Sequence, residues 1–280
     1  MPGTSSHSDR VGKMTLERRL SPEEEELQAK QAELDALLNQ LAQKELDLET
    51  LHAEINTFFL AYNPAVLPKV AEARELRARI AQAMYILDPR EDTQNESREA
   101  RESAEQSERD RQEQFGASEP HEAVQPESFK PSPELRSIYL DLVKKAHPDL
   151  GKDDEDRRRR NDFMVRVNQA YQDGDASALQ ALANEWALGG DPSEGESVGD
   201  RLVRLIRQIS DVRNRLATMD TEIENVKNSD DYLLVNQAEQ VRSEGRDLIA
   251  EHVDRTQEHI DDLESQIADI NDRLTRASNG

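Results

Sequence analysis

The tripeptide His147-Pro148-Asp149 has residue types suited to holding a loop in one shape and presenting it to another protein. Proline lacks an N–H and fixes its own backbone angle, so Pro148 restricts the turn. Asp149 offers a carboxylate that only accepts hydrogen bonds, which suits an arginine of a partner. His147 has a flat ring that donates or accepts. Alone, such a tripeptide is more often a plain turn; as a binding loop it is expected to be exposed, and its flanks decide between the two.

No bond-making chemistry is expected elsewhere in the chain. The sequence has no cysteine, which excludes disulfides, thiolate zinc sites and cysteine nucleophiles. It also lacks a phosphate-binding loop, a dinucleotide fingerprint and a Ser/His/Asp set. We therefore expect no enzyme, no cofactor and no metal site. The arginine run 157–160 directly follows the acidic run 153–156, so their charges largely cancel and no nucleic-acid site is expected.

The tripeptide is flanked by two amphipathic patterns that predict helices. The first begins at Ser132-Pro133, a cap followed by proline, and must end before Pro148, because proline disfavours helical geometry in the preceding residue. The second ends near Gly174, and Asp175 can cap a third, short helix that carries Trp186. The first two helices predict a small core made of Leu135, Ile138, Tyr139, Leu142, Met164, Val167, Ala170 and Tyr171.

Two helices joined by a loop that begins His147-Pro148-Asp149 resemble the J-domain of DnaJ-type co-chaperones. In that family an aromatic residue stands eight positions before the histidine and an aliphatic residue five before it, as Tyr139 and Leu142 do here. The second helix of the family ends in an aliphatic-Asn-x-Ala-Tyr pattern, which residues 167–171 match. The resemblance covers about 60 residues, 129–190.

One part of the family pattern is missing. The short first helix of the family, with its Tyr-x-x-Leu-type pattern, has no room here because Pro126, Pro131 and Pro133 occupy its place. We expect Phe129 and the helix at 176–188 to fill part of the missing contact. The Gly/Phe-rich region and the zinc repeats of full DnaJ proteins are also absent from the sequence.

The resemblance implies a partner and a role. A J-domain docks on a DnaK-type heat-shock chaperone and promotes ATP hydrolysis at the ATP site of that partner. Carried over to this chain, the docking residues are the tripeptide and the basic side chains of the helix before it: His147, Pro148, Asp149, Arg136, Lys144 and Lys145. The alternative is a structural coiled-coil adaptor whose J-like segment is degenerate and does not stimulate an ATPase.

The overall composition favours helices over a single large core. Of the 280 residues, 35% are hydrophobic and 34% are charged, and the net charge is −23; an ordinary domain has about 45–50% apolar and about 25% charged residues. So acidic a chain is not expected to bind nucleic acid or an anionic membrane. It also lacks the run of about 18 apolar residues that would span a bilayer. We expect an all-α cytoplasmic protein.

Heptad patterns on both sides of the J-like segment predict coiled-coil arms. In the N-terminal arm, residues 21–88, apolar residues recur every seven positions, and Pro64 and Pro68 are expected to end the first helix, so that the arm folds as a helical hairpin. In the C-terminal arm, residues 200–276, all eight seam positions of the first helix are apolar. The short turn at Asn228-Ser229 then predicts an antiparallel hairpin.

Two segments are expected to lack a fixed fold. Residues 1–20 form a flexible N-terminal tail, and residues 89–128 form a disordered acidic linker, because their few large hydrophobic residues cannot offset the entropy of ordering. Alternating Glu and Arg can give this linker transient helix over 96–114.

The two coiled-coil arms are expected to bind an unidentified client protein, and their seams can close within one chain or between two copies.

Overall fold

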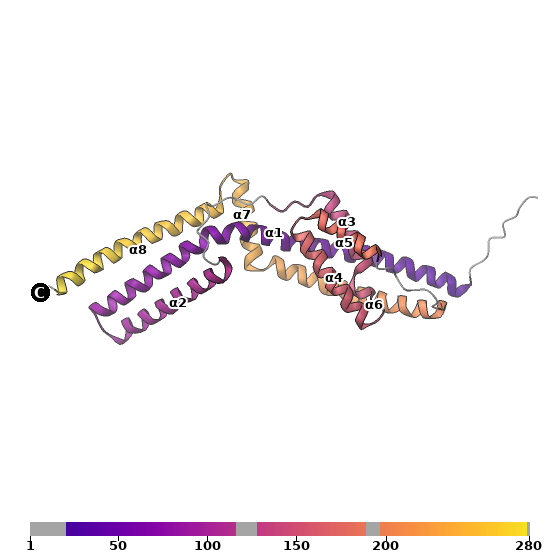
Figure 1. Cartoon of the computed structure of the whole chain (residues 1–280), viewed down its shortest axis with the longest axis horizontal. Coiled ribbons are helices and arrows are strands. Elements are labelled where there is room, and N and C mark those ends of the chain that lie inside the picture. The colour runs from indigo at the N-terminus through magenta and orange to yellow at the C-terminus, as the bar shows by residue number, and fades with distance from the viewer. Residues whose placement is uncertain (1–20, 116–127, 189–196, 279–280) are drawn as a thin grey trace, which may run out of the picture.

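The computed structural model describes residues 21–115, 128–188 and 197–278, and within these ranges the chain is all-α, with eight α-helices and no strand (Figure 1). The helices are α1 (Pro22–Leu87), α2 (Glu91–Phe115), α3 (Pro133–Ala146), α4 (Asp154–Gln172), α5 (Ala176–Leu188), α6 (Val198–Lys227), α7 (Asp230–Ser243) and α8 (Leu248–Ser278). The predicted flexible tail, 1–20, lies outside the described ranges, as do residues 116–127 of the predicted linker and residues 189–190 of the J-like segment.

The longest element, α1, is a single helix of 66 residues, which at about 1.5 Å per residue is about 100 Å long. It begins at a capping box, in which the Glu24 N–H donates to Ser21 Oγ (3.3 Å) and the Ser21 N–H donates to Glu24 Oε2 (2.8 Å). The prediction of an N-terminal helical hairpin over 21–88 is wrong, because α1 continues through Pro64 and Pro68 without reversing.

Both prolines weaken α1 locally, because proline has no N–H to donate to the carbonyl four residues earlier. Proline inside a helix normally bends it, and Figure 1 shows α1 changing direction near its middle. Packing offsets the lost hydrogen bonds: beside the prolines, Phe58 and Val66 are buried in one cluster with Ile249 of α8. Tertiary contacts thus keep intact a helix that local sequence rules would end.

The C-terminal helices run along α1 in the same direction as α1, so that residue numbers rise together on both sides (Figure 1). The side-chain pairs that establish this are, in order along α1, Glu33 with Arg213, Lys44 with Asp220, Tyr62 with His252 and Lys69 with Gln257. The prediction of an antiparallel hairpin over 200–276 is therefore wrong. α6 packs on the N-terminal half of α1 and α8 on its C-terminal half, instead of on each other.

The apolar seams of α6 and α8 both close on α1 because α1 offers heptad positions along its whole length. The α1–α6 seam buries Leu34, Leu38, Leu41, Leu48, Leu205, Ile209, Val212 and Met219, and the α1–α8 seam buries Ala73, Leu76, Ile260 and Leu263. Between these seams the chain recaps at Ser229, whose Oγ accepts from the Tyr232 N–H (3.2 Å). The short α7 ends at Ser243, Gly245 (φ +77°) lies in the turn that follows, and α8 continues along α1.

The segment expected to be a disordered linker is helical over its described part, as α2, and folds back along the C-terminal half of α1. The turn is fixed by Thr93, whose hydroxyl donates to Asp88 O (2.7 Å). Further along, Arg74 of α1 donates to Ser107 of α2. The expectation failed because α2 is not a lone helix: α1 supports it, and i,i+4 pairs such as Arg101–Glu105 (2.8 Å) add to its stability.

The helices α3, α4 and α5 form a compact unit beside the N-terminal half of α1, here called the α3–α5 unit (Figure 1). Local signals set its bounds: Ser132 Oγ accepts from the Leu135 N–H (3.1 Å) at the start of α3, and Asp175 Oδ1 accepts from the Ala178 N–H (2.8 Å) at the start of α5. Gly174 has a positive φ (+70°), which lets the chain turn between α4 and α5.

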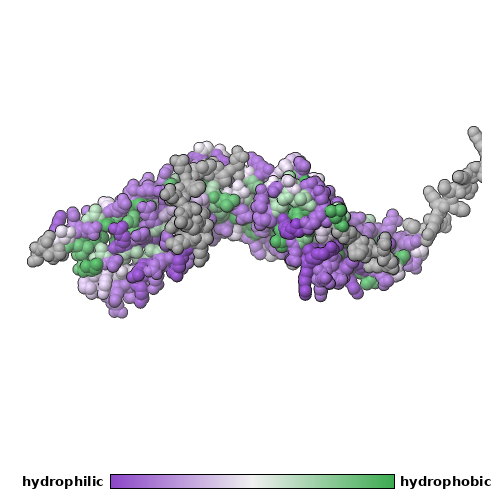
Figure 2. Space-filling model, in the orientation of Figure 1, coloured by the Kyte–Doolittle hydropathy of each residue, from purple (hydrophilic) through white to green (hydrophobic). Residues whose placement is uncertain are grey.

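Hydrophilic residues cover much of the visible face of the molecule, and apolar ones gather where helices meet (Figure 2).

Candidate functional site

Residues 147–149, here called the His-Pro-Asp loop, form a tight turn between α3 and α4 that is held by its own backbone. The His147 N–H donates to Val143 O (3.1 Å) and ends α3. His147 Nδ1 accepts from the Asp149 N–H (3.1 Å), and the Leu150 N–H donates to His147 O (3.1 Å), which closes a 3-10 turn. Because Nδ1 accepts a hydrogen bond, the proton of the neutral ring is on Nε2.

The structure buries His147, which is only 4% exposed, beside α1. Its Nε2 lies 3.5 Å from Glu45 Oε1, and the same oxygen accepts from Arg215 of α6 at 3.2 Å. Burial raises the pKa of the Glu45 carboxyl, but the hydrogen bond with His147 and the charge of Arg215 outweigh burial, so the pKa is lowered overall. The expectation that His147 is exposed is therefore wrong. Its ring belongs to a buried polar chain that joins the loop, α1 and α6.

The rest of the loop also faces helices of the same chain. The Asp149 side chain is 23% exposed, and its Oδ2 is buried without accepting a hydrogen bond, 3.6 Å from His147 Nδ1. Pro148 is half-buried. The next residue, Leu150, packs against the α1–α6 seam, and its carbonyl accepts from Gln208 Nε2 of α6 (2.9 Å). This burial of the loop could not be predicted from the sequence, because it depends on which helix lies next to the loop.

The basic residues expected to dock a partner lie at two ends of α3. Lys144 and Lys145 are next to the loop; Lys145 is exposed, and Lys144 is half-exposed and pairs with Asp141 (3.4 Å). Arg136 is exposed about two turns earlier, about 12–14 Å away along the helix axis. The structure thus groups the two lysines with the His-Pro-Asp loop and places Arg136 apart from them.

At the start of α4, Asp156 binds Arg159 and Arg160 of the acidic and basic run that follows the loop; these three residues are here called the latch. Asp156 accepts from Arg159 (2.6 Å), from Arg160 (2.9 Å) and from the Lys152 N–H (3.2 Å). Burial alone would raise the pKa of Asp156, but these hydrogen bonds lower it to about 2. Arg160 is buried and also donates to Lys145 O (2.9 Å), which ties α4 to the end of α3.

Both arginines of this latch lie over the ring of Trp186 from α5, at 5.2 Å for Arg159 and 5.1 Å for Arg160. Such cation–π contacts position α5 against α4. The sequence placed Trp186 on a helix but did not connect it with the arginine run. The ion pairs within the run were the only available signal, and they do not reveal a contact with a residue so far along the chain.

The core of the α3–α5 unit contains the residues expected from the sequence and, in addition, a strip of α1. Seven of the eight expected residues are buried, and Ile138 is partly buried against them. Tyr139 and Tyr171 pack ring to ring at 4.6 Å, and burial raises the pKa of Tyr139 well above its usual range. Phe129 meets the Tyr171 ring edge-on at 5.7 Å.

A strip of α1 completes the core of the α3–α5 unit on one side. Ala42 and Leu46 of α1 are buried in the same cluster as α3, α4 and α5. A polar network continues from it: Tyr139 donates to Asn168 (3.1 Å), and Asn168 donates to Glu49 of α1 (2.9 Å). Sequence reasoning missed all three α1 residues, since their positions show only that they belong to a heptad helix.

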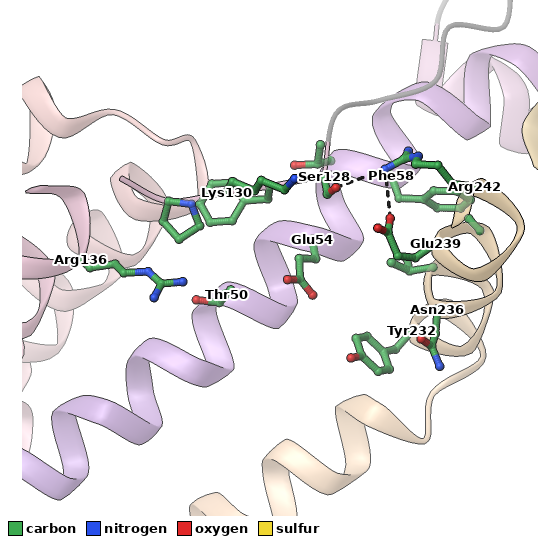
Figure 3. Close-up of a pocket in the computed structure, with 15 residues that line it drawn as sticks. Thr50, Glu54, Phe58, Ser128, Lys130, Arg136, Tyr232, Asn236, Glu239 and Arg242 are labelled. Atoms are coloured by element: carbon green, nitrogen blue, oxygen red, sulfur yellow. Dashed lines mark hydrogen bonds and ion pairs between the residues drawn. The ribbon is translucent and has the colours of Figure 1, made fainter. Parts of the chain in front are cut away.

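A pocket of about 430 Å³ lies between α1, α7 and the segment that leads into α3 (Figure 3). Arg136 and Lys130 line one side of it, and Arg242 on the other side donates to Glu239 (3.0 Å) and Ser128 (3.2 Å). The pocket is separate from the His-Pro-Asp loop, which is not among its lining residues.

Glu54 also lines this pocket, and burial together with the nearby charge of Glu239 raises the pKa of its carboxyl.

Across the described parts of the chain, no group of three or more His, Asp or Glu residues is placed to hold a metal ion. In the same residues no helix is both long and apolar enough to cross a membrane. No protein-family model, curated protein or solved structure matches this chain.

Proposed function

We propose that the chain is a J-domain-type co-chaperone. Its α3–α5 unit docks on a DnaK-type heat-shock chaperone through the His-Pro-Asp loop and stimulates ATP hydrolysis by that partner. The other helices form a long body that brings the chaperone to a client protein. The observation that carries the proposal is the His-Pro-Asp loop itself, a rigid turn at the junction of two packed helices whose aromatic core contains Tyr139 and Tyr171.

Each part of the loop contributes a recognisable interaction. Pro148 and the Asp149 N–H bond to His147 fix the turn, so a partner meets one shape and not an ensemble. The Asp149 carboxylate is suited to an arginine of the chaperone. Lys144 and Lys145 beside it provide positive charge in an otherwise acidic chain, which attracts an acidic docking surface. The chain performs no bond chemistry of its own in this proposal.

The test is the steady-state ATPase rate of a DnaK-type chaperone with the full chain added. His147→Gln and Asp149→Asn should each abolish the stimulation, because they change the recognised loop. His259→Gln is the matched control, since His259 lies on α8 and pairs with Arg77 (2.9 Å) far from the loop. Circular dichroism should show equal helix content in all variants. Stimulation that is the same with wild type and both loop variants would exclude this function.

A second function is favoured by one observation, the burial of His147 against Glu45. In this alternative the chain is a coiled-coil adaptor, and its J-like segment is a structural spacer that packs on the body. The two proposals differ in what happens when the loop is uncovered. A spacer gives no ATPase stimulation in any form of the chain, whereas a co-chaperone gives stimulation once the loop can be reached.

A further inference from the structure

The His-Pro-Asp loop is covered by α6, although α6 is not part of the α3–α5 unit. Three contacts make the cover. Gln208 Nε2 donates to Leu150 O (2.9 Å), the Leu150 side chain packs against the α1–α6 seam, and Asp211 lies 3.5 Å from Arg157 at the start of α4. The first two join α6 to Leu150, the residue directly after the loop, and the third joins it to the first turn of α4.

The cover extends to the groups that a chaperone would have to meet. Arg215 of α6 reaches under the loop to Glu45, which in turn holds His147. In the arrangement that the structure shows, Oδ2 of Asp149 is buried, so an arginine of a partner cannot form a two-pronged contact with that carboxylate. Docking through the loop therefore requires this arrangement of the loop, α1 and α6 to open.

The direct contacts of α6 with the loop and with the start of α4 are few compared with the apolar seam that holds α6 on α1. They consist of one hydrogen bond to a carbonyl, one exposed ion pair and the edge of one leucine, and such polar contacts are individually weak. The α3–α5 unit keeps its own anchor on α1 through Ala42, Leu46 and Glu49. The unit thus keeps its own attachment to α1 if the stretch of α6 beside the loop is released from the α1–α6 seam.

We propose that α6 is an intramolecular cover that regulates access to the His-Pro-Asp loop. The chain exists in a closed form, in which α6 covers the loop, and an open form, in which a DnaK-type chaperone can dock. This inference rests on the proposed co-chaperone function. It adds that the closed form is inactive, and that the balance between the two forms sets how strongly the chain stimulates the chaperone.

The cover can be measured without any partner, because the chain has no natural cysteine. Leu150→Cys places a thiol under α6 and leaves the His-Pro-Asp loop intact. Its rate of reaction with a maleimide reports how often the loop is open. Ser137→Cys, on the exposed face of α3, is the reference for a thiol that is always accessible.

Two changes on α6 should open the cover. Gln208→Ala removes the hydrogen bond to Leu150 O, and Asp211→Arg places a like charge opposite Arg157. Each should speed the labelling of Leu150→Cys about fivefold, the change expected for the loss of one such contact, and leave Ser137→Cys unchanged. Asp211→Arg lies on the surface, so it tests the cover even if Gln208→Ala disturbs the buried seam.

Two further variants serve as matched controls. Arg157→Glu combined with Asp211→Arg restores opposite charges and should return the labelling rate to that of the wild type. Arg213→Ala removes a pair between α6 and Glu33 of α1 that does not touch the loop, so it should have no effect on the labelling rate. An unchanged rate with both opening variants would overturn the cover.

The ATPase assay then separates this inference from the function on which it rests. Asp211→Arg should raise stimulation of the chaperone, and the charge-swapped pair should lower it again. Faster labelling with equal stimulation by wild type and Asp211→Arg would overturn the regulatory role of the cover and leave the co-chaperone function standing. Faster labelling with no stimulation by any form would overturn the co-chaperone function and, with it, the regulation.

Discussion

Two carboxylates hold the chain in place at the two ends of the His-Pro-Asp loop. Glu45 holds the His147 side, and Asp156 holds the side where α4 begins. Asp156 has the more strongly shifted titration, with a pKa lowered to about 2 by hydrogen bonds that exist only in the folded chain. A carboxylate held in this way links the stability of the α3–α5 unit to pH.

The first prediction follows from the sign of that shift. The pKa of Asp156 in the folded chain, about 2, is below its unfolded value of 3.8, so the charged form stabilises the fold above about pH 4 and loses this effect as pH falls toward 2. Urea unfolding at about pH 5 should show Asp156→Asn to be about 2 kcal/mol less stable than wild type. At about pH 2.5 the difference should fall below about 1 kcal/mol.

Glu155→Gln provides the control for this titration, because Glu155 is the exposed neighbour of Asp156. Its unfolding free energy should differ little from that of the wild type at either pH. A difference between Asp156→Asn and wild type that stays constant from pH 5 to 2.5 would show that the latch does not depend on the charge of Asp156.

At the scale of elements, the sequence determines how helices start but not which helices pair. The caps at Ser132 and Asp175 could be predicted because a cap depends only on the next three residues. Pairing could not be predicted, because a heptad seam specifies an apolar stripe that fits several partners of the same kind. The α6 seam of Leu205, Ile209 and Val212 therefore suggested a hairpin with the next helix, whereas it packs on α1.

The same limit explains the two errors in the N-terminal half and the gap in the site. Pro64 and Pro68 are strong local stop signals, yet contacts with α8 keep α1 helical. The α2 segment has almost no apolar residues, yet α1 supports it. The tripeptide at 147–149 could be singled out from its own residues, but its cover by Glu45 and Gln208 depends on the pairing and could not be.

The second prediction concerns the strip of α1 that completes the α3–α5 core. Leu46→Ala should destabilise this unit by about 2–4 kcal/mol, because Leu46 is 4% exposed and its loss leaves a cavity. Leu60→Ala makes the same change on the same helix at a site that is 78% exposed, and should stay within about 0.5 kcal/mol of wild type. Hydrogen exchange of the backbone amides of α3, α4 and α5 in the full chain measures both.

This comparison also tests whether the unit can stand without α1. If Leu46→Ala and Leu60→Ala give equal exchange in α3–α5, the unit folds on its own core and α1 is only its neighbour. If Leu46→Ala alone speeds exchange there, the J-like segment is completed by the N-terminal helix, as the burial of Ala42 and Leu46 indicates.

At the scale of the whole molecule, the chain is a long, bent body with α1 as its common axis (Figure 1). One half carries α6 and the α3–α5 unit, and the other half carries α2 and α8. Because α6 and α8 are placed end to end along α1, they lie much further apart than in the hairpin that their sequence suggests. This difference can be measured directly.

The third prediction is a distance between spin labels in the full chain. Labels at Arg207→Cys on α6 and Gln266→Cys on α8 should be more than about 60 Å apart, because they lie beside parts of α1 separated by about 50 residues. An antiparallel α6–α8 hairpin would bring them to about 20–25 Å. Labels at Arg79→Cys and Gln266→Cys should be close together, since Ile80 and Ile267 belong to one cluster.

The continuity of α1 through its two prolines gives the molecule a fixed internal spacing. Glu45 lies beside the His-Pro-Asp loop and Leu87 ends the helix at the far tip, so the two places are separated by about 60 Å along one continuous, bent helix. Anything held at the tip is kept at that separation and at a set rotational phase relative to the loop. Adding seven residues to α1 would increase the separation by about 10 Å and preserve the phase, whereas adding two would turn the tip by about 200°.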